Sequence, residues 1–367
     1  MPAPPRLHLF LALCLIALVG GCEAPRKPRS PAEVRAELER LLPPATRDRA
    51  AWARDFQTAF SALKIEPHSS NLCAALAVTE QESGFSPDPA VPGLGRIALA
   101  EIERRAAKIN VPRFLVHAAL GLQSPDGKTY QQRLSAVRTE RDLSEMFEDM
   151  IGSVPLGSRL LANANPVHTG GPMQVSIPFA ENYSRTHEYP YPVDGSIRHE
   201  VFTRRGGVYF GVAHLLGYAA SYDQPLYRFA DFNAGFYASR NAAFQKAASI
   251  ASGQSITMDG DLLRYRSKRK GVGATEAAVR SISWQLEMDD ARIHRELQLG
   301  NSIRLEKSEL YRRVFELAEE RNRKPLARAL MPRITLESPK ITRKLTTEWF
   351  ATRVDQRYRR CLAKARR

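Results

Sequence analysis

Residues 72–85 read LCAALAVTEQESGF, an apolar run that ends in a short polar segment. Its first seven residues are all apolar and predict one buried helix, which Ser70 or Asn71 can cap and Gly84 can stop. Glu82 would then lie in the last turn of a core helix, where burial and the negative end of the helix dipole favour a protonated carboxyl group. General-acid cleavage of a glycosidic bond requires such a group. Taken alone, however, the spacing favours a solvated glutamate at a helix end.

Two further motifs follow Glu82 and change this interpretation. Residues 170–175 read GGPMQV and residues 230–235 read ADFNAG. With ESGF at residues 82–85, they resemble, in the same order, the catalytic Glu-Ser, Gly-Leu-Met-Gln and Ala-Tyr-Asn-Ala-Gly motifs of the family 1 lytic transglycosylases, which have a goose-type lysozyme fold. This resemblance covers about residues 65–250, and only at the motifs. The whole chain also resembles a group of uncharacterised bacterial lipoproteins that carry a domain of unknown function.

The resemblance implies a peptidoglycan lytic transglycosylase with a single catalytic carboxyl group, that of Glu82. Such enzymes cleave the bond between N-acetylmuramic acid and N-acetylglucosamine and release a 1,6-anhydro sugar. Glu82 would protonate the leaving oxygen, and its carboxylate would then take the proton of the C6 hydroxyl. The substrate's own acetamide would replace the second carboxylate of ordinary glycosidases, so no metal or cofactor is expected. Glu80 lies about 200° around the helix from Glu82, and we expect it to face outward or to support the site by hydrogen bonding.

The same resemblance assigns substrate contacts to the first two motifs. Ser83 would orient the substrate or the carboxylate. Gly171 lets a backbone approach a ligand, Met173 offers an apolar wall, and Gln174 can bond to a hydroxyl or acetamide group. The alternative is a glycine turn with Met173 in the core. Pro172 departs from the family's leucine, and the gap of about ninety residues before this motif requires an insertion.

The third motif would add Phe232 and Asn233 to the substrate site. Asn233 can bond to sugar groups, and Phe232 can stack on a sugar ring, although it lacks the hydroxyl of the family's tyrosine. Tyr237 is a candidate to supply that hydroxyl. The alternative is a core stripe of Phe229, Phe232 and Phe236 at helical spacing, which we expect to hold for two of the three.

Three other functions stay open. The first is a peptidoglycan-binding lipoprotein without turnover. The second is a hydrolytic muramidase, in which Asp88 or Asp231 would activate water. The third is a structural adaptor in the envelope that uses the basic C-terminal region. The sequence contains no His-Glu-x-x-His pattern, Walker loop or Gly-x-Ser-x-Gly elbow.

The beginning of the chain predicts a lipid-anchored envelope protein. Arg6 and His8 precede an apolar stretch over residues 9–19, which is shorter than the roughly 20 residues of a membrane-spanning helix. Small residues directly before Cys22 resemble the bacterial lipobox, which implies cleavage there and acylation of Cys22. Glu23 is not the aspartate of inner-membrane retention, which favours the outer membrane, facing the periplasm. We expect residues 24–31, which are basic and proline-rich, to be an extended tether.

Composition and charge agree with a globular envelope protein. The 367-residue chain is 43% hydrophobic and carries a formal net charge of +15. Basic residues greatly outnumber acidic ones between Arg321 and Arg367. This excess would suit anionic peptidoglycan, lipopolysaccharide or phospholipid rather than nucleic acid, and the alternative is a solvated arginine-rich helix. Cys73 and Cys361 either pair in the oxidising periplasm or are separate buried thiols.

Apolar residues recur at helical spacing along most of the chain, and strand signals are few. We therefore expect an all-α, lysozyme-like domain of goose type with a helical insertion and a basic helical C-terminal extension. The expected helices span residues 31–42, 48–63, 97–109, 115–122, 142–151, 207–222, 241–251, 275–299 and 308–321, with a further one opened by Pro225. The expected segments are a signal peptide (1–21), an acylated tether (22–45), a catalytic domain (46–270, with the insertion at about 97–165) and the extension (271–367).

Overall fold

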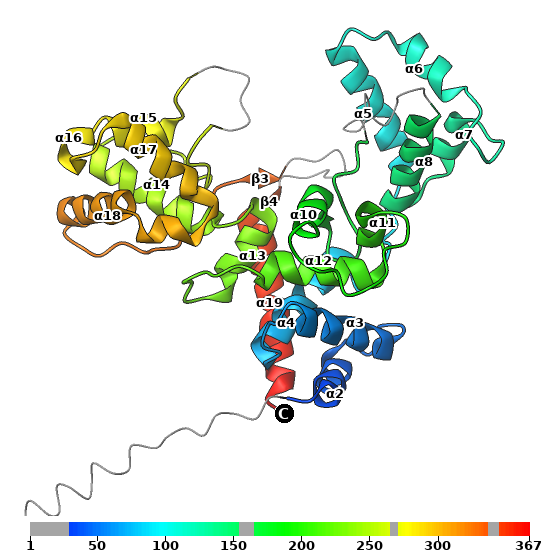
Figure 1. The fold of residues 1–367 in the computed structure, drawn as a ribbon, viewed down its shortest axis with the longest axis horizontal. Coiled ribbons are helices and arrows are strands. Elements are labelled where there is room, and N and C mark those ends of the chain that lie inside the picture. Colours follow the sequence, from blue (N-terminus) through cyan, green and yellow to red (C-terminus); the bar gives the residue numbers. More distant parts are fainter. Residues whose placement is uncertain (1–28, 154–164, 265–270, 337–344) are drawn as a thin grey trace, which may run out of the picture.

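The structure is a computed structural model of the chain that describes residues 29–153, 165–264, 271–336 and 345–367. The predicted signal peptide and the acylation site at Cys22 therefore lie outside the described residues. Helices dominate, as expected (Figure 1). Strands in the described ranges form two antiparallel ladders, β1 (Thr169–Gly170) with β2 (Val175–Ser176), and β3 (Thr335–Leu336) with β4 (Leu345–Thr346). In this part of the chain no helix has the length and apolar character needed to cross a bilayer.

The first hydrophobic core joins the N-terminal two thirds of the chain to its last helix. Its helices are α2 (Pro31–Leu41), α3 (Arg49–Ala62), α4 (Ser69–Ser83), α5 (Leu94–Lys108), α6 (Arg113–Leu120), α7 (Tyr130–Ala136), α8 (Glu140–Gly152), α10 (Ile177–Tyr183), α11 (Ile197–Val201), α12 (Arg204–Leu216), α13 (Pro225–Ala234) and α19 (Thr347–Ala365).

Helix α4 is the predicted core helix. Its residues 72–79 are all buried, and Gly84 ends it with a left-handed φ of 58°, as expected. The start of the helix differs from the expectation. Neither Ser70 nor Asn71 caps it, because the helix begins at Ser69 and the ring of His68 accepts a hydrogen bond from the backbone N–H of Asn71.

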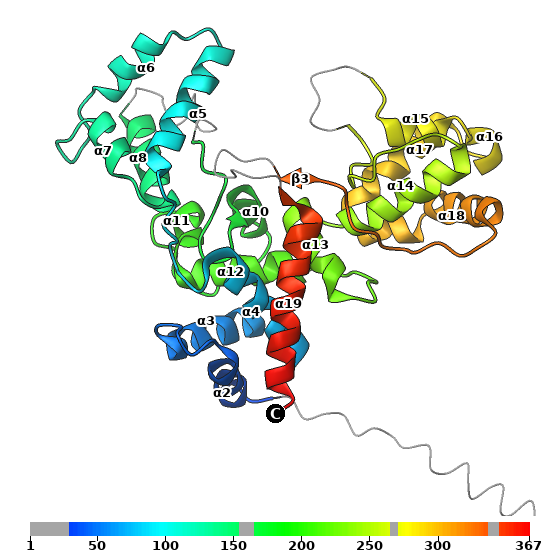
Figure 2. The same cartoon turned by 180° about the vertical axis from the view of Figure 1, so that it is seen from behind.

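A disulfide joins α4 to the C-terminal helix α19. Cys73 and Cys361 are paired, with their Cα atoms 5.5 Å apart and a sequence separation of 288. The ion pairs of Glu80 with Arg357 and Arg360 lie along the same seam. Of the two alternatives for the cysteines, the structure therefore shows pairing, and the end of the chain is fixed to the helix that bears Glu82. Figures 1 and 2 show α19 (red) lying along α4 (blue) in both views.

The predicted insertion forms a separate helical lobe. Helices α5 to α8 project away from α2, α3 and α4 (Figures 1 and 2). A backbone hydrogen bond of 2.8 Å from Val91 to Arg138 closes the base of α5, α6 and α7. Gly95 allows α5 to approach α7, because a Cβ atom at this position would lie 2.1 Å from the carbonyl oxygen of Leu134.

A second hydrophobic core forms from residues 243–318. Its elements are α14 (Ala238–Ser252), α15 (Ala274–Arg280), α16 (Ser283–Leu286), α17 (Asp290–Leu297), the 3₁₀ helices η1 (Gln298–Asn301) and η2 (Ile303–Lys307), and α18 (Glu309–Asn322).

The two cores correct the expected boundary at residues 270 and 271. Helix α14 belongs to the second core, whereas α19 returns to the first. The helix expected over residues 275–299 is divided into α15, α16 and α17, because Glu287 adopts a left-handed conformation and Asp289 caps a new helix.

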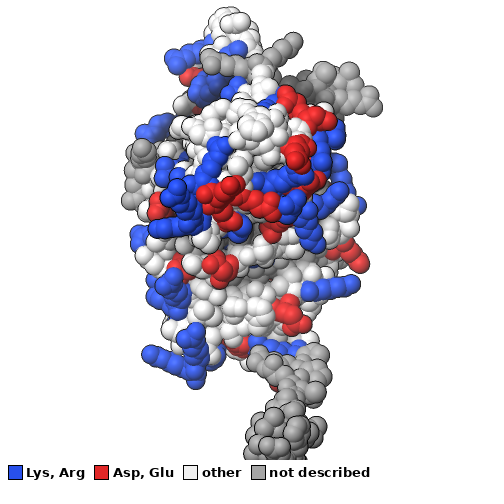
Figure 3. Space-filling model, turned by 90° about the vertical axis from the view of Figure 1, so that its left-hand side faces the viewer, with Lys and Arg blue, Asp and Glu red and all other residues white. Residues whose placement is uncertain are grey.

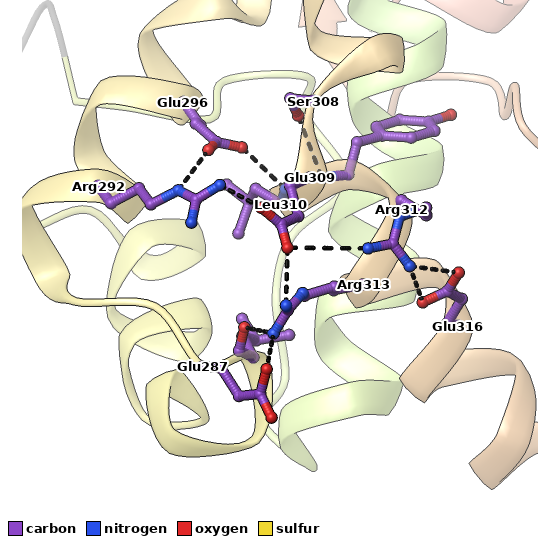
Figure 4. A network of polar contacts seen from close by, with 11 residues as sticks. Glu287, Arg292, Glu296, Ser308, Glu309, Leu310, Arg312, Arg313 and Glu316 are labelled. Carbon is purple, nitrogen blue, oxygen red and sulfur yellow. Dashed lines mark hydrogen bonds and ion pairs between the residues drawn. The ribbon is translucent and has the colours of Figure 1, made fainter.

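The second unit does not have the basic surface expected of the C-terminal extension. Residues 274–330 contain 11 Lys and Arg against 10 Asp and Glu. Figure 3 shows the two signs interleaved on this side of the molecule, and Figure 4 shows Glu309 shared by Arg292, Arg312 and Arg313. The positive excess lies instead on α19 and its flanks, where residues 345–367 contain seven Lys and Arg against two acids.

The disulfide predicts a large effect on stability. Replacing both partners, Cys73→Ser with Cys361→Ser, is expected to lower the free energy of unfolding by about 2–5 kcal/mol, because the cross-link constrains a very long loop in the unfolded chain. Urea unfolding measures this loss, and reductant should reproduce it in the wild-type protein but leave the variant unchanged. Equal unfolding midpoints for variant and wild type without reductant would contradict it.

Candidate functional site

Glu82 lies in the last turn of α4 and is partly exposed, whereas residues 72–79 of the same helix are buried. Ser83 follows it, and its hydroxyl donates to the carbonyl oxygen of Thr79 at 3.1 Å. The hydroxyl of Thr79 in turn donates to the carbonyl of Ala75 at 2.9 Å. Ser83 therefore stabilises the end of the helix, which is the structural alternative to its predicted contact with substrate.

Glu80 supports the packing of α19. Its Oε1 lies 3.2 Å from a guanidinium nitrogen of Arg360 and 3.6 Å from one of Arg357. Two residues along a helix correspond to about 200° of rotation, so Glu82 lies on the other side of α4 from this ion-pair cluster. Of the two alternatives for Glu80, the structure shows polar contacts, and these bind the residue to α19.

The second motif forms the turn between β1 and β2, and it packs against other parts of the protein. Gly171 has a φ of 71°, and a Cβ atom there would lie 2.0 Å from the carbonyl oxygen of Val201. Gly211 of α12 leaves room for the side chain of Met173, which is fully buried. The assignments of Gly171 and Met173 to the substrate site are therefore wrong, because both residues fill the junction of the hairpin with α11 and α12.

Gln174 is the member of this motif that reaches the surface. It is partly exposed and has a left-handed φ of 49°. Its Nε2 donates to the carbonyl oxygen of Gly171 at 3.2 Å. The hydroxyl of Thr169 lies 3.5 Å from its Oε1, so Gln174 closes its own turn while the residue stays partly exposed.

The third motif ends α13 and contacts both α12 and α19. Phe232 is buried, with its ring centroid 5.0 Å from that of His214, so its assignment as an open stacking platform is wrong. Asn233 is partly exposed, and its Oδ1 accepts a hydrogen bond of 3.0 Å from the hydroxyl of Thr347. Phe229 is also buried, whereas Phe236 is partly exposed, so two of the three phenylalanines form the core stripe as expected.

Asp231 of the third motif and Tyr237, which follows the motif, have structural roles. Asp231 is buried and accepts hydrogen bonds from the hydroxyls of Tyr218 and Tyr222 and from the backbone N–H of Ser239. It is therefore unsuited to activate water, the role suggested for it in a muramidase. The hydroxyl of Tyr237 donates to the carbonyl of Ala219 at 2.8 Å, so it is occupied by the protein itself.

Helix α12 is the common neighbour of all three motif segments. Helix α4, strand β2 and helix α13 each pack against it. Gly207 and Gly211 of α12 receive Pro172 and Met173, and His214 receives Phe232. The structure thus gathers the segments around one buried helix. Among the seven residues assigned to the site, those with accessible side chains are Glu82, Ser83, Gln174 and Asn233.

His214 is a residue of this region that the sequence analysis missed. Its ring lies 4.7–5.0 Å from the rings of Phe179, Phe232 and Phe236. Burial lowers the pKa of His214 to about 4, and its Nδ1 is a buried atom without a hydrogen-bond partner in the structure described. The sequence did contain a signal for this residue, since His214 lies inside the apolar run of residues 207–216. A histidine in such a run is expected to have a neutral ring.

Comparisons with known proteins identify relatives of this chain. The sequence profile of a family described as "Protein of unknown function (DUF1615)" matches residues 45–364. "Uncharacterized protein YaiW" of Escherichia coli (strain K12) is 51% identical over 357 residues, which cover 96% of this chain and 97% of the relative. No solved structure matches the chain. Within the residues described, no group of three or more His, Cys, Asp or Glu side chains is arranged to hold a metal ion.

The low pKa of His214 predicts an acid-sensitive fold. Its folded-state pKa of about 4 lies below the usual 6.5, so the unfolded chain takes up the proton first as the pH falls. This contribution to stability is fully present above pH 6.5 and decreases by up to about 3 kcal/mol as the pH falls to about 4. The variant His214→Phe is expected to lack this decrease in urea unfolding across that range. As a control, the exposed His187→Gln should retain it, and identical pH profiles for wild type and His214→Phe would contradict the prediction.

Proposed function

Because the chain belongs to the DUF1615 family, whose description names no activity, we propose its function from the site. We propose that it is a peptidoglycan lytic transglycosylase with a lysozyme-like fold of goose type, and that Glu82 is its general acid. The observation that carries the proposal is the position of Glu82. Glu82 is partly exposed at the end of a buried helix, about 200° around that helix from Glu80 and its arginines. The helix packs against α12, as do the other two motif segments.

The proposed reaction uses one carboxyl group twice. Glu82 donates its proton to the glycosidic oxygen as the bond to C1 of N-acetylmuramic acid breaks. The acetamide oxygen of the same sugar stabilises the positive charge at C1. The Glu82 carboxylate then takes the proton of the C6 hydroxyl as O6 forms the new bond to C1, which returns the acid to its starting state and adds no water.

Substrate contacts in this proposal come from fewer residues than the motifs imply. Gln174 and Asn233 are partly exposed on segments that pack against α12, and amide groups can bond to sugar hydroxyls or to an acetamide. Gly171, Met173 and Phe232 contribute by packing these segments together. The proposed partners are peptidoglycan glycan strands and a membrane to which acylated Cys22 anchors the chain. We propose that this is the outer membrane and that the protein faces the periplasm.

Asp88 favours a second candidate function, that of a hydrolytic muramidase. It lies six residues after Glu82 and is partly exposed, and burial raises the pKa of its carboxyl group despite nearby Thr139 and Arg141. A carboxylate poised in this way can activate water, which ring closure does not need. The two reactions differ in product mass, because hydrolysis adds one water.

Glu82→Gln tests the proposal. General acid catalysis contributes about 10²–10⁴-fold in rate, so we expect at least a hundredfold loss of anhydro-muropeptide release from purified sacculi, measured by mass spectrometry, with an unchanged melting temperature. Glu80→Gln is the matched control, since it removes an ion pair from the same helix and should keep activity. Full activity of Glu82→Gln would refute the assignment, and sacculus binding without any product would favour a binding lipoprotein.

A further inference from the structure

Helix α6, at the tip of the lobe formed by α5 to α8, has two apolar faces with Arg113 and His117 between them. Its sequence from Arg113 to Leu120 is RFLVHAAL. Val116 and Leu120 are buried and face the lobe, where α6 packs against α5 and α7. Phe114 and Leu115 lie on the outer side and are 69% and 48% exposed. A surface helix normally presents polar residues to solvent, so the apolar outer face of α6 is suited to a further partner.

The loops on either side of α6 extend this apolar surface. Ile109 precedes the helix and is 73% exposed, and Leu122 follows it and is 62% exposed. The other exposed large apolar side chains in the described part of the chain are Val193, Val272 and Trp284, and they are far apart in sequence. We call Ile109, Phe114, Leu115 and Leu122 the α6 patch. Concentrations of this kind mark interaction sites, whereas single exposed apolar side chains are ordinary.

Positive charge predominates in α5 to α7, the part of the lobe that bears the α6 patch, whereas α8 is acidic. Residues 94–138 contain eight Lys and Arg against three Asp and Glu. Lys108 and Arg113 are exposed beside the patch, and Arg113 lies 3.3 Å from Glu103, so part of its charge is compensated. Exposed aromatic and aliphatic side chains within a basic surface are typical of segments that lie in the interface of an anionic bilayer.

We propose that the α6 patch inserts into the surface of an anionic lipid bilayer. Phe114, Leu115 and the two loop residues enter the region between headgroups and acyl chains, while Lys108 and the other cations of the lobe contact lipid phosphates. The proposal depends neither on catalysis by Glu82 nor on acylation of Cys22. The lobe and the point where the described chain begins lie at opposite ends of the molecule in Figures 1 and 2. A chain that is also anchored through Cys22 would thus contact lipid at both ends.

Vesicle co-sedimentation of residues 22–367, the chain expected after signal-peptide cleavage, tests this proposal, with Cys22→Ser present throughout so that neither the apolar residues 9–19 nor an acyl chain contributes. The protein is expected to bind phosphatidylglycerol vesicles and to bind phosphatidylcholine vesicles at least tenfold more weakly. Adding Phe114→Ser and Leu115→Ser should raise the lipid concentration for half-maximal binding at least tenfold. The matched control is Trp284→Ser, because Trp284 is 75% exposed on the second unit and should contribute nothing.

Several results would overturn the proposal. The first is that the protein does not sediment with phosphatidylglycerol vesicles. The second is equal binding to both lipids, and the third is an equal loss of binding in the Trp284→Ser control. A self-association that depends on Phe114 and Leu115 in sedimentation velocity, without vesicle binding, would assign the patch to a second copy of the chain instead. Melting temperatures check that the variants fold, and Ile109→Ser with Leu122→Ser repeats the test from the flanking loops.

Discussion

The contact between α4 and α19 is the constraint on which the rest of the first core depends. The disulfide of Cys73 with Cys361 and the ion pairs of Glu80 hold the end of the chain against the helix that carries Glu82. Once placed there, α19 also reaches α13, through the ring contact of Phe229 with Tyr358 and the hydrogen bond of Thr347 to Asn233. The last helix of the chain thereby links the first motif helix to the third. The intervening second unit is connected at both ends to parts of one core.

Helix α12 provides the other half of this arrangement. Its glycines allow the β1–β2 turn to approach the helix closely, since a Cβ atom at Gly207 would lie 2.3 Å from Pro172 and one at Gly211 would lie 2.3 Å from Met173. Gly207 thereby makes room for the ring of Pro172 in the turn. The residues that make the motifs recognisable are thus largely packing residues, and they hold the few accessible polar groups, Glu82, Gln174 and Asn233, on segments with a common neighbour.

Charge is distributed unevenly between the parts of the molecule. In the second unit, arginines and glutamates pair along and between α17 and α18, so its surface is mixed in sign (Figure 4). Positive charge predominates instead on α19 and in α5 to α7 of the lobe, whereas α8 is acidic. These two regions differ in kind. The arginines of α19 that meet Glu80 stabilise an intramolecular seam, whereas the cations of α5 to α7 lie in the part of the lobe that bears an apolar surface, a combination that suits a lipid partner.

The sequence by itself determined the helical class, most helix positions and the buried character of α4, because these follow from local apolar periodicity and from end signals such as Gly84. It also indicated, as alternatives to substrate contacts, the core positions that Met173 and Phe232 occupy. Only the tertiary structure decided that Cys73 pairs with Cys361, that α14 and α19 exchange their expected domains, and that His214 is enclosed by phenylalanines. The physical reason is that these outcomes depend on contacts between residues far apart in the chain, which no local pattern specifies. The exposure of the α6 patch was likewise decided by the tertiary structure. The sequence of an apolar helix does not show whether its outer face is covered or exposed.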